Sequence, residues 1–274
     1  MGSATRQALA ESRSALAALA GSGDGASGPG SSGLEVGAQL FTAGEVIGTS
    51  GQLRQLLADP SSGRSEKKAI IQRVFGSHLS TAVQTLLVTV ATNRWSDTDD
   101  VLAGIEELGL RAIADSASSG TDIENELFAF GTAVRTDAEL ELAVGSKLGD
   151  TEAKVALVEH LLAGEASPQT LAIVRHLVRQ PRGRRIGQLL SSAASVIADQ
   201  AGLSVATITT ASPLAAAQLQ LLQERLSTNY GRALRVNQVI DGRVLGGVRV
   251  QIGDDIIDGS VSSKLKDLKL QLVA

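Results

Sequence analysis

The sequence predicts a mainly α-helical chain that ends in an α+β domain: two tandem helical bundles, followed by a small domain of a β-meander and helices. From Leu34 to about residue 200, apolar residues recur at three- and four-residue steps, the spacing of one face of a helix. Two stretches of this region are similar at a fixed offset, and after Gly202 apolar and β-branched residues alternate as they do in strands. The predicted domains are therefore 1–117, 118–200 and 201–274.

Composition limits the class of protein. A chain of 274 residues exceeds the usual single-domain size, and its formal net charge of −4 argues against a nucleic-acid or anionic-lipid surface. It has no cysteine, which excludes disulfides, thiolate metal sites and cysteine nucleophiles. No apolar run reaches the roughly 18 residues that a membrane-spanning helix needs, and the start lacks the apolar core of a signal peptide. We expect a soluble intracellular protein that reaches a membrane only through partners.

The chain is predicted to begin with a helix over residues 4–20, in which Ala8, Leu9, Leu16 and Leu19 form one apolar stripe. The next stretch, 21–33, is rich in glycine and serine, and its composition is typical of a flexible loop. We expect this loop to tether the first helix to the first bundle.

The similarity between the two helical stretches has a constant register. Leu40 and Phe41 correspond to Leu127 and Phe128, an offset of 127 − 40 = 87 residues. The same offset pairs Gly44 with Gly131, Leu53 with Leu140, Lys67 with Lys154, Ile70 with Leu157, Ile71 with Val158, Val74 with Leu161, Phe75 with Leu162, Leu86 with Ile173 and Val90 with Leu177. Agreement without gaps predicts a duplicated helical unit. Such tandem units form stacking or binding architectures more often than active sites.

The last part of the chain changes period. A strand is predicted over 203–210 and a helix over 214–229. Ser212 followed by Pro213 has the chemistry of a helix start. Ser260 is predicted to cap a final helix.

Residues 234–260 predict the β-meander. Apolar residues alternate on both sides of Asp241-Gly242, a dipeptide that suits the tight turn of a hairpin, so the two runs are predicted to pair. Gly246 and Gly247 lie inside the second run and indicate a bulge or a close backbone approach. A phosphate-binding loop is disfavoured here, because neither Lys-Ser nor Lys-Thr follows and a strand stands where a helix would be needed.

Taken together, this stretch resembles the C-terminal signature of the δ subunit of F-type ATP synthases, the family called OSCP in mitochondria. The residues that carry the resemblance are Ile240, Asp241, Val244, Gly246, Gly247, Val248, Val250, Gly253, Ile257, Asp258, Gly259 and Ser260. The resemblance implies structural roles for six of them, namely Asp241, Gly246, Gly247, Gly253, Asp258 and Gly259. It implies no catalytic, cofactor-binding or metal-binding residue.

The resemblance also implies a function. Family members form part of the peripheral stalk, or stator, on the cytoplasmic face of the bacterial plasma membrane. Their helical bundle holds N-terminal segments of α subunits, their C-terminal domain engages the b subunit, and they reach the membrane only through this hetero-oligomeric complex. They bind no nucleic acid and carry out no catalysis. The usual member has one bundle; an enlarged δ subunit with a second bundle is similar to the actinobacterial form.

Other chemistry finds little support in the sequence. His78, His160 and His176 lack a second ligand at metal-binding spacing. The basic run of Arg179, Arg182, Arg184 and Arg185 is interpreted as a solvated loop and helix start, or else as a contact with an acidic partner surface. The aspartates at 241, 254, 255 and 258 lack the spacing of a calcium loop, and turn chemistry accounts for them.

Two alternatives to the stator remain open from sequence. The first is a helical-repeat adaptor that binds amphipathic helices in an unrelated assembly. The second is a small enzyme, although the chain shows no nucleophile elbow or cluster of convergent titratable groups. Copurification with the α, β, γ, ε and b chains would separate the stator from the adaptor.

Overall fold

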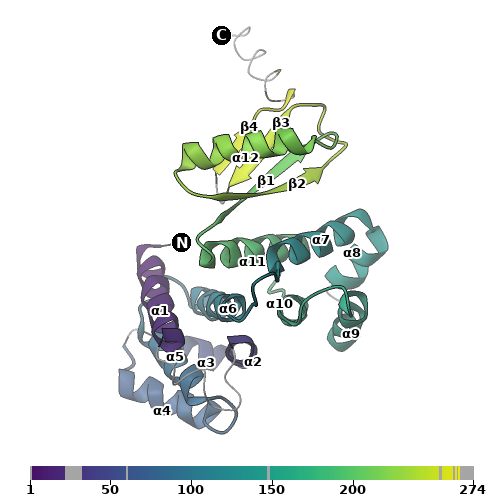
Figure 1. Cartoon of the computed structure of the whole chain (residues 1–274). Coiled ribbons are helices and arrows are strands. Elements are labelled where there is room, and N and C mark those ends of the chain that lie inside the picture. The colour runs from purple at the N-terminus through teal and green to yellow at the C-terminus, as the bar shows by residue number, and fades with distance from the viewer. Residues whose placement is uncertain are drawn as a thin grey trace.

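The computed structural model describes residues 2–21, 33–59, 61–146, 149–252 and 255–261, together with 263 and 265. Helices fill most of the chain and a small sheet lies near its C-terminal end (Figure 1). The helical elements are α1 (Ser3–Gly21), α2 (Gly33–Thr49), α3 (Gly51–Ala58), α4 (Arg64–Phe75), α5 (Thr81–Thr92), α6 (Thr98–Asp115), α7 (Ile123–Thr136), α8 (Ala138–Gly145), α9 (Thr151–Leu162), α10 (Pro168–Arg179), α11 (Ile186–Gln200) and α12 (Ala216–Tyr230). The strands are β1 (Ser204–Thr210), β2 (Leu234–Ile240), β3 (Val248–Ile252) and β4 (Asp255–Asp258). The predicted fold class is confirmed.

Some predicted segments lie outside the described residues. They include nearly all of the loop predicted at 21–33, Gly253, and most of the final helix. At the start of that helix the Oγ of Ser260 accepts a hydrogen bond from the N–H of Ser263 at 3.2 Å, as a capping residue does.

The helix starts follow ordinary capping chemistry. A side chain just before the first turn accepts a backbone N–H, which satisfies a donor that the helix itself cannot pair. The residues that do so are Ser50, Ser80, Asp97, Asp122, Asp137, Asp150 and Ser167. The predicted cap at Ser212 is wrong. Its carbonyl instead accepts the hydroxyl of Thr210 in a turn, and α12 begins only at Ala216.

The helices repeat with the spacing that the sequence predicts. Starts and ends of α3, α4 and α5 lie 87 residues before those of α8, α9 and α10, for example 138 − 51 = 87. We call α1 to α6 the first bundle and α7 to α11 the second bundle. The domain boundaries near residues 117 and 200 stay a prediction.

Helix α6 belongs to two cores at once. Ile105 and Leu108 lie in the core of the first bundle, whereas Leu110 and Ile113 lie in the core of the second. Phe41 of α2 also enters the second core. The two bundles are therefore fused along α6 and are not joined by a linker.

Glycines let α2 cross α6 at very short range. A Cβ atom built on Gly37 would lie 2.4 Å from Cγ1 of Ile113 and 2.7 Å from the carbonyl oxygen of Gly109. A Cβ on Gly109 would lie 2.5 Å from a ring carbon of Phe41. Only residues without a side chain fit such a crossing, so these glycines fix how closely the two helices pack.

The C-terminal sheet has the strand order β2-β1-β3-β4. Strand β1 pairs with β2 in parallel and with β3 antiparallel, and only β3 and β4 form a hairpin. The predicted meander is therefore wrong, because β1 lies between the two runs that were expected to pair.

Local geometry at the predicted hairpin turn explains the difference. Gly242 does not adopt the positive φ of a tight hairpin. The carboxylate of Asp241 instead accepts the N–H of Arg243 at 2.9 Å, and the N–H of Asp241 donates to the carbonyl of Thr210 on β1. The connection between β2 and β3 thus passes the end of β1, and the chain re-enters the sheet on the other side of that strand.

The sheet is the middle layer of the C-terminal region. Ala206, Ile208 and Leu226 form a core between β1 and α12 on one face. The opposite face of β1 and β2 meets α7 and α11 of the second bundle, which lie below the sheet in Figure 1. Both faces of the central strand are therefore covered.

The glycine crossing predicts the effect of adding one methyl group. Gly37→Ala should lower the free energy of unfolding by about 2 kcal/mol, because its Cβ would meet backbone and force the helices apart. On the same helix Gly48→Ala should be neutral or slightly stabilising, because its Cβ would lie 3.8 Å from its nearest neighbours. Urea unfolding followed by circular dichroism measures both, and equal effects would contradict this account.

Candidate partner-binding surfaces and the joints between units

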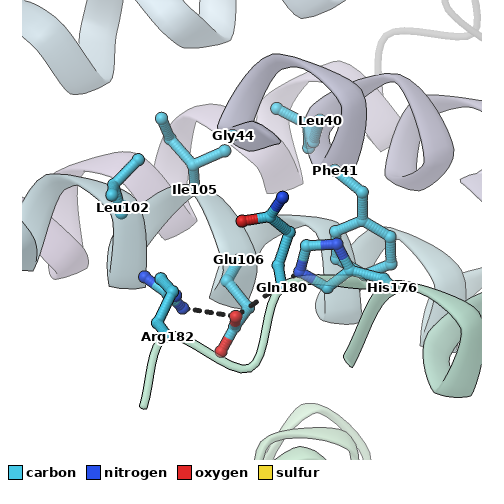
Figure 2. Close-up of a pocket in the computed structure, with 9 residues that line it drawn as sticks. All are labelled: Leu40, Phe41, Gly44, Leu102, Ile105, Glu106, His176, Gln180 and Arg182. Atoms are coloured by element: carbon cyan, nitrogen blue, oxygen red, sulfur yellow. Dashed lines mark hydrogen bonds and ion pairs between the residues drawn. The ribbon is translucent and has the colours of Figure 1, made fainter. Parts of the chain in front are cut away.

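The first joint is the contact of α10 and residues 180–185 with α2 and α6. The ring of His176 stacks on Phe41, with centroids 3.8 Å apart and planes 6° from parallel. Leu40 and Gly44 of α2 lie beside this pair, as Figure 2 shows. The space left between the elements is only about 10 Å³, so the joint is tightly packed.

Glu106 of α6 is the ionic centre of the first joint. Both of its oxygens accept hydrogen bonds from the guanidinium of Arg184 at 2.9 Å. Arg182 forms a further ion pair with it, and Nε2 of His176 lies 3.4 Å away. Because the Glu106 side chain is only 11% exposed, its charge depends on these partners for solvation.

The surroundings of Glu106 shift its titration. Burial alone would raise the pKa of this carboxyl, but hydrogen bonds from His176 and Arg184 and the charges of Arg182 and Arg184 outweigh burial and lower the pKa to about 2. The ionised form is therefore favoured over the whole physiological range.

The second joint is the contact of β1 and β2 with α7 and α11. Val205 and Thr207 of β1 and Asn237 and Val239 of β2 line a cavity of about 80 Å³ above the two helices. At its rim, Arg235 of β2 forms ion pairs with the carboxylates at positions 122 and 124, next to the start of α7. This joint is less completely filled than the first.

The residues of the C-terminal motif shape local backbone. Gly246 and Gly247 have φ values of 136° and 83°, which disfavour other residues. A Cβ on Gly247 would lie 2.5 Å from the carbonyl oxygen of Gly259. The expected close approach is present; it precedes β3 and is not a bulge inside the strand.

The motif aspartates act in turns. The carboxylate of Asp258 accepts the N–H of Ser260 at 3.0 Å, and Asp241 accepts from Arg243 as described above. The N–H of Gly259 donates to the carbonyl of Val248 at 2.9 Å, which extends the hairpin. The structure thus brings five motif residues together around one end of the sheet, and their proposed importance to the family rests on this shaping.

The predicted basic run is mostly a loop and a helix start, as one interpretation had it, but three of its arginines form ion pairs within the chain. Arg182 and Arg184 pair with Glu106 inside the chain, and Arg179 pairs with Glu152. Arg185 is exposed at the start of α11. Most arginines of this run therefore pair with carboxylates of the same chain.

The part of the chain that the structure describes contains neither a metal-binding cluster nor a membrane-spanning helix. There, no group of three or more His, Cys, Asp or Glu residues could hold a metal ion. Among the same residues, no helix combines the length and the apolar character needed to cross a bilayer.

Two further surfaces lie at opposite ends of the chain. At the first bundle, a hollow of about 750 Å³ lies between α1 and the segment 92–96, which includes Trp95. At the C-terminal region, six large apolar side chains are 42–78% exposed: Ile240, Leu245, Ile256, Ile257, Val261 and Leu265. They do not form one patch, because Ile240 lies on one edge strand and Ile256 and Ile257 lie on the other; Leu245 and Val261 are linked by a backbone hydrogen bond between Val261 and Gly246.

Sequence reasoning missed several residues that hold the units together. No sequence pattern indicated Glu106 or Arg235, because the residues that they pair with are distant in sequence. Lys67, only 2% exposed, donates to the carbonyls of Leu57 and Ala91 at 2.8 and 2.6 Å. Its match with a lysine at position 154 in the repeat was the one available signal.

A comparison with protein-family models gives two matches. The model of the ATP synthase delta (OSCP) subunit matches residues 31–112 and again residues 108–272. The chain belongs to the ATP synthase delta (OSCP) subunit family. The two matches overlap inside α6, the helix that both cores share.

Relatives of this delta subunit family match over nearly the whole chain. The ATP synthase subunit delta of Leifsonia xyli is 53% identical over 99% of both chains. That of Acidothermus cellulolyticus is 36% identical over 88% of this chain and 89% of its own. A chain of the Toxoplasma gondii mitochondrial ATP synthase hexamer is similar at 19% identity with a TM-score of 0.40, over 61% of this chain and 95% of that one.

The close approach at Gly247 predicts a local loss of stability. Gly247→Val should lower the free energy of unfolding by roughly 1–3 kcal/mol, because the branched side chain meets backbone at a positive φ. Gly242→Ala is the matched control and should change stability little, because no atom lies within 4 Å of its Cβ. Thermal unfolding of both variants checks this, and a normally stable Gly247→Val would show that the approach is not tight.

The lowered pKa of Glu106 predicts a pH-dependent contribution to stability. A carboxyl whose pKa falls on folding stabilises the folded state above its unfolded pKa, near 4.5, and this contribution is lost as the pH falls towards 2. Glu106→Gln should therefore cost about 1–3 kcal/mol at pH 7. The difference from the unmodified chain should shrink to less than half at pH 3.

Denaturant unfolding at the two pH values measures this difference. Glu165→Gln, at an exposed position after α9, is the matched control and should change stability by less than about 0.5 kcal/mol at either pH. A cost for Glu106→Gln that is the same at pH 7 and pH 3 would contradict the assignment.

Proposed function

We propose that this chain is the δ subunit of the peripheral stalk of a bacterial F-type ATP synthase. In this role it links the catalytic α/β head to the b-subunit stalk and resists the torque of the rotor. It is a non-catalytic member of a hetero-oligomer and lies at the cytoplasmic face of the plasma membrane through that complex. The observation that carries the proposal is the relationship to ATP synthase delta subunits over 99% of both chains.

The arrangement of the units supports a linking role. The first bundle and the C-terminal sheet lie at opposite ends of the molecule, with the second bundle between them (Figure 1). A linker that carries load needs two separate attachment surfaces and firm joints between them. The hollow beside α1 and the exposed apolar side chains near β4 are such surfaces.

The first bundle is the proposed site for an N-terminal segment of an α subunit. Helix α1 packs on α5 and α6 much as α6 packs on α10 and α11. In the second bundle the seam between α6 and α10 is closed by α2, which leaves about 10 Å³. In the first bundle the hollow beside α1 and α5 remains open at about 750 Å³. The lining is mostly polar, with Ala4, Ala8 and Trp95 as its apolar members, so the hollow suits a segment that presents mainly polar side chains and a few small apolar ones.

The C-terminal surface is the proposed site for the b subunit. Leu245 is 78% exposed in the connection between β2 and β3, and Val261 is 42% exposed just after Ser260. The two lie close together, because the N–H of Val261 donates to the carbonyl of Gly246 at 3.0 Å. An exposed apolar surface of this kind suits the apolar stripe of a long helix.

The proposed surface predicts uncoupling when it is made polar. Leu245→Asp with Val261→Asp should abolish copurification of b and lower ATP-driven proton pumping in membranes, because the head is no longer held. ATP hydrolysis by the head should persist, because this chain contributes no reacting group. Leu142→Asp, at a side chain 71% exposed on α8, is the matched control and should leave both activities coupled.

Hydrolysis, pumping and copurification are measured side by side in the same membranes. Retention of b with fully coupled pumping in the double variant would remove the C-terminal attachment from the proposal. Loss of hydrolysis as well would point to a role of this chain in assembling the head.

A further inference from the structure

The two joints of the chain rest on equivalent positions of the repeat. The first joint uses one face of α2, and the second joint uses one face of α7. The residues on α2 are Leu40, Phe41 and Gly44, and those on α7 are Leu127, Phe128 and Gly131, each 87 residues further along the chain. All three positions of α2 recur among the four residues of α7 that line the second joint; the fourth, Arg135, corresponds to Gly48, which does not line the first.

The second helix of each face shows the same correspondence. Helices α6 and α11 begin at residues 98 and 186, so their offset is 186 − 98 = 88. At that offset Leu102 and Glu106 of the first joint correspond to Leu190 and Ala194 of the second. The extra residue lies in the connection that precedes each helix. This connection spans 93–97 before α6 and 180–185 before α11, so it is one residue longer in the second bundle.

Both faces also have a glycine at their centre. A Cβ on Gly44 would lie 3.5 Å from Cγ2 of Ile105, and one on Gly131 would lie 3.5 Å from Cδ1 of Leu190. A methyl group fits at either position, but a longer side chain would project into the joint. Because glycine has no side chain, another element can pack directly on each face at this position.

Charged residues face one another across both joints. In the first joint the face contributes Glu106, and the docked segment contributes His176, Arg182 and Arg184. In the second joint, position 122 and the start of α7 contribute two carboxylates, and the docked strand β2 contributes Arg235. The second joint also has the reverse arrangement, because Arg135 on the α7 face lines its cavity and its charge acts on Asp241 at the end of β2.

We propose that α2–α6 and α7–α11 present one docking surface used twice, so that each bundle holds the next unit of the chain through the same face. In the first bundle the guest is a helix end with its loop, and in the second it is the open face of a sheet. The surface therefore accepts a helix end or a sheet face. This assignment holds whichever subunits the chain binds.

The exchange of Glu106 for alanine at position 194 allows a direct test. Equivalence of the faces places a carboxylate introduced by Ala194→Glu in the 80 Å³ cavity that Asn237 also lines. In an Arg135→Gln background, which removes the cation that already lines this cavity, it should open the second joint, because a buried carboxylate without a partner is costly. Asn237→Arg should supply the missing cation and close the joint again, as Arg184 does for Glu106.

Joint closure is read from a distance between two spin labels in the full-length chain. The sequence has no cysteine, so Ser192→Cys on α11 and Gln220→Cys on α12, both exposed, give labels without background. We expect one narrow distance for the Arg135→Gln parent, loss of that distance when Ala194→Glu is added, and its recovery when Asn237→Arg is added as well. Asn229→Arg, at an exposed site on α12, is the matched control and should not restore it.

A second pair of variants keeps the test independent of charge. Gly131→Leu should also abolish the narrow distance, whereas Gly131→Ala should preserve it. Circular dichroism on every variant separates an open joint from an unfolded bundle. An unchanged distance in both Gly131→Leu and Ala194→Glu, the latter in the Arg135→Gln background, or a failure of Asn237→Arg to rescue a folded Ala194→Glu, would overturn the proposal.

Discussion

The close crossing of α2 over α6 is the constraint on which the rest of the molecule depends. Glycines at positions 37 and 109 bring the two backbones almost into contact, so α6 is held from one side by α2. Leu110 and Ile113 of the same helix close the second core, and Ile113 does so beside Gly37 of α2. Because one helix completes two cores, the angle between the bundles follows from packing. A flexible linker between them would have left that angle free.

Charged residues reinforce the same helix. Arg111 is only 5% exposed and joins Glu107 of its own helix to Asp199 of α11, while Arg13 of α1 reaches Glu107 from the other side. Buried ion pairs of this sort add little net stability but make an alternative packing expensive, because each charge would lose its partner. These ion pairs therefore favour one relative arrangement of α1, α6 and α11.

Sequence patterns predicted the features that depend on near neighbours. Helical spacing, the cap at Ser260 and the repeat at 87 residues all appear in the structure as expected. Strand pairing could not be predicted in the same way. The choice of β1 as central strand follows from pairing that is distant along the chain, and the Asp241-Gly242 signal favoured a hairpin that never forms. The joint at Glu106 was missed for a similar reason, since His176 and Arg184 lie 70 and 78 residues away.

The sharing of α6 has a consequence for how the protein is made. The ribosome releases a chain from its N-terminal end, and units generally fold as they emerge. The first core needs nothing beyond the end of α6 at residue 115. When α7 to α11 follow, they meet a helix that is already fixed in place, and this surface templates their assembly. A nascent chain halted just after α6 should therefore contain a formed first bundle, whereas the second bundle made without α6 would lack one wall of its core.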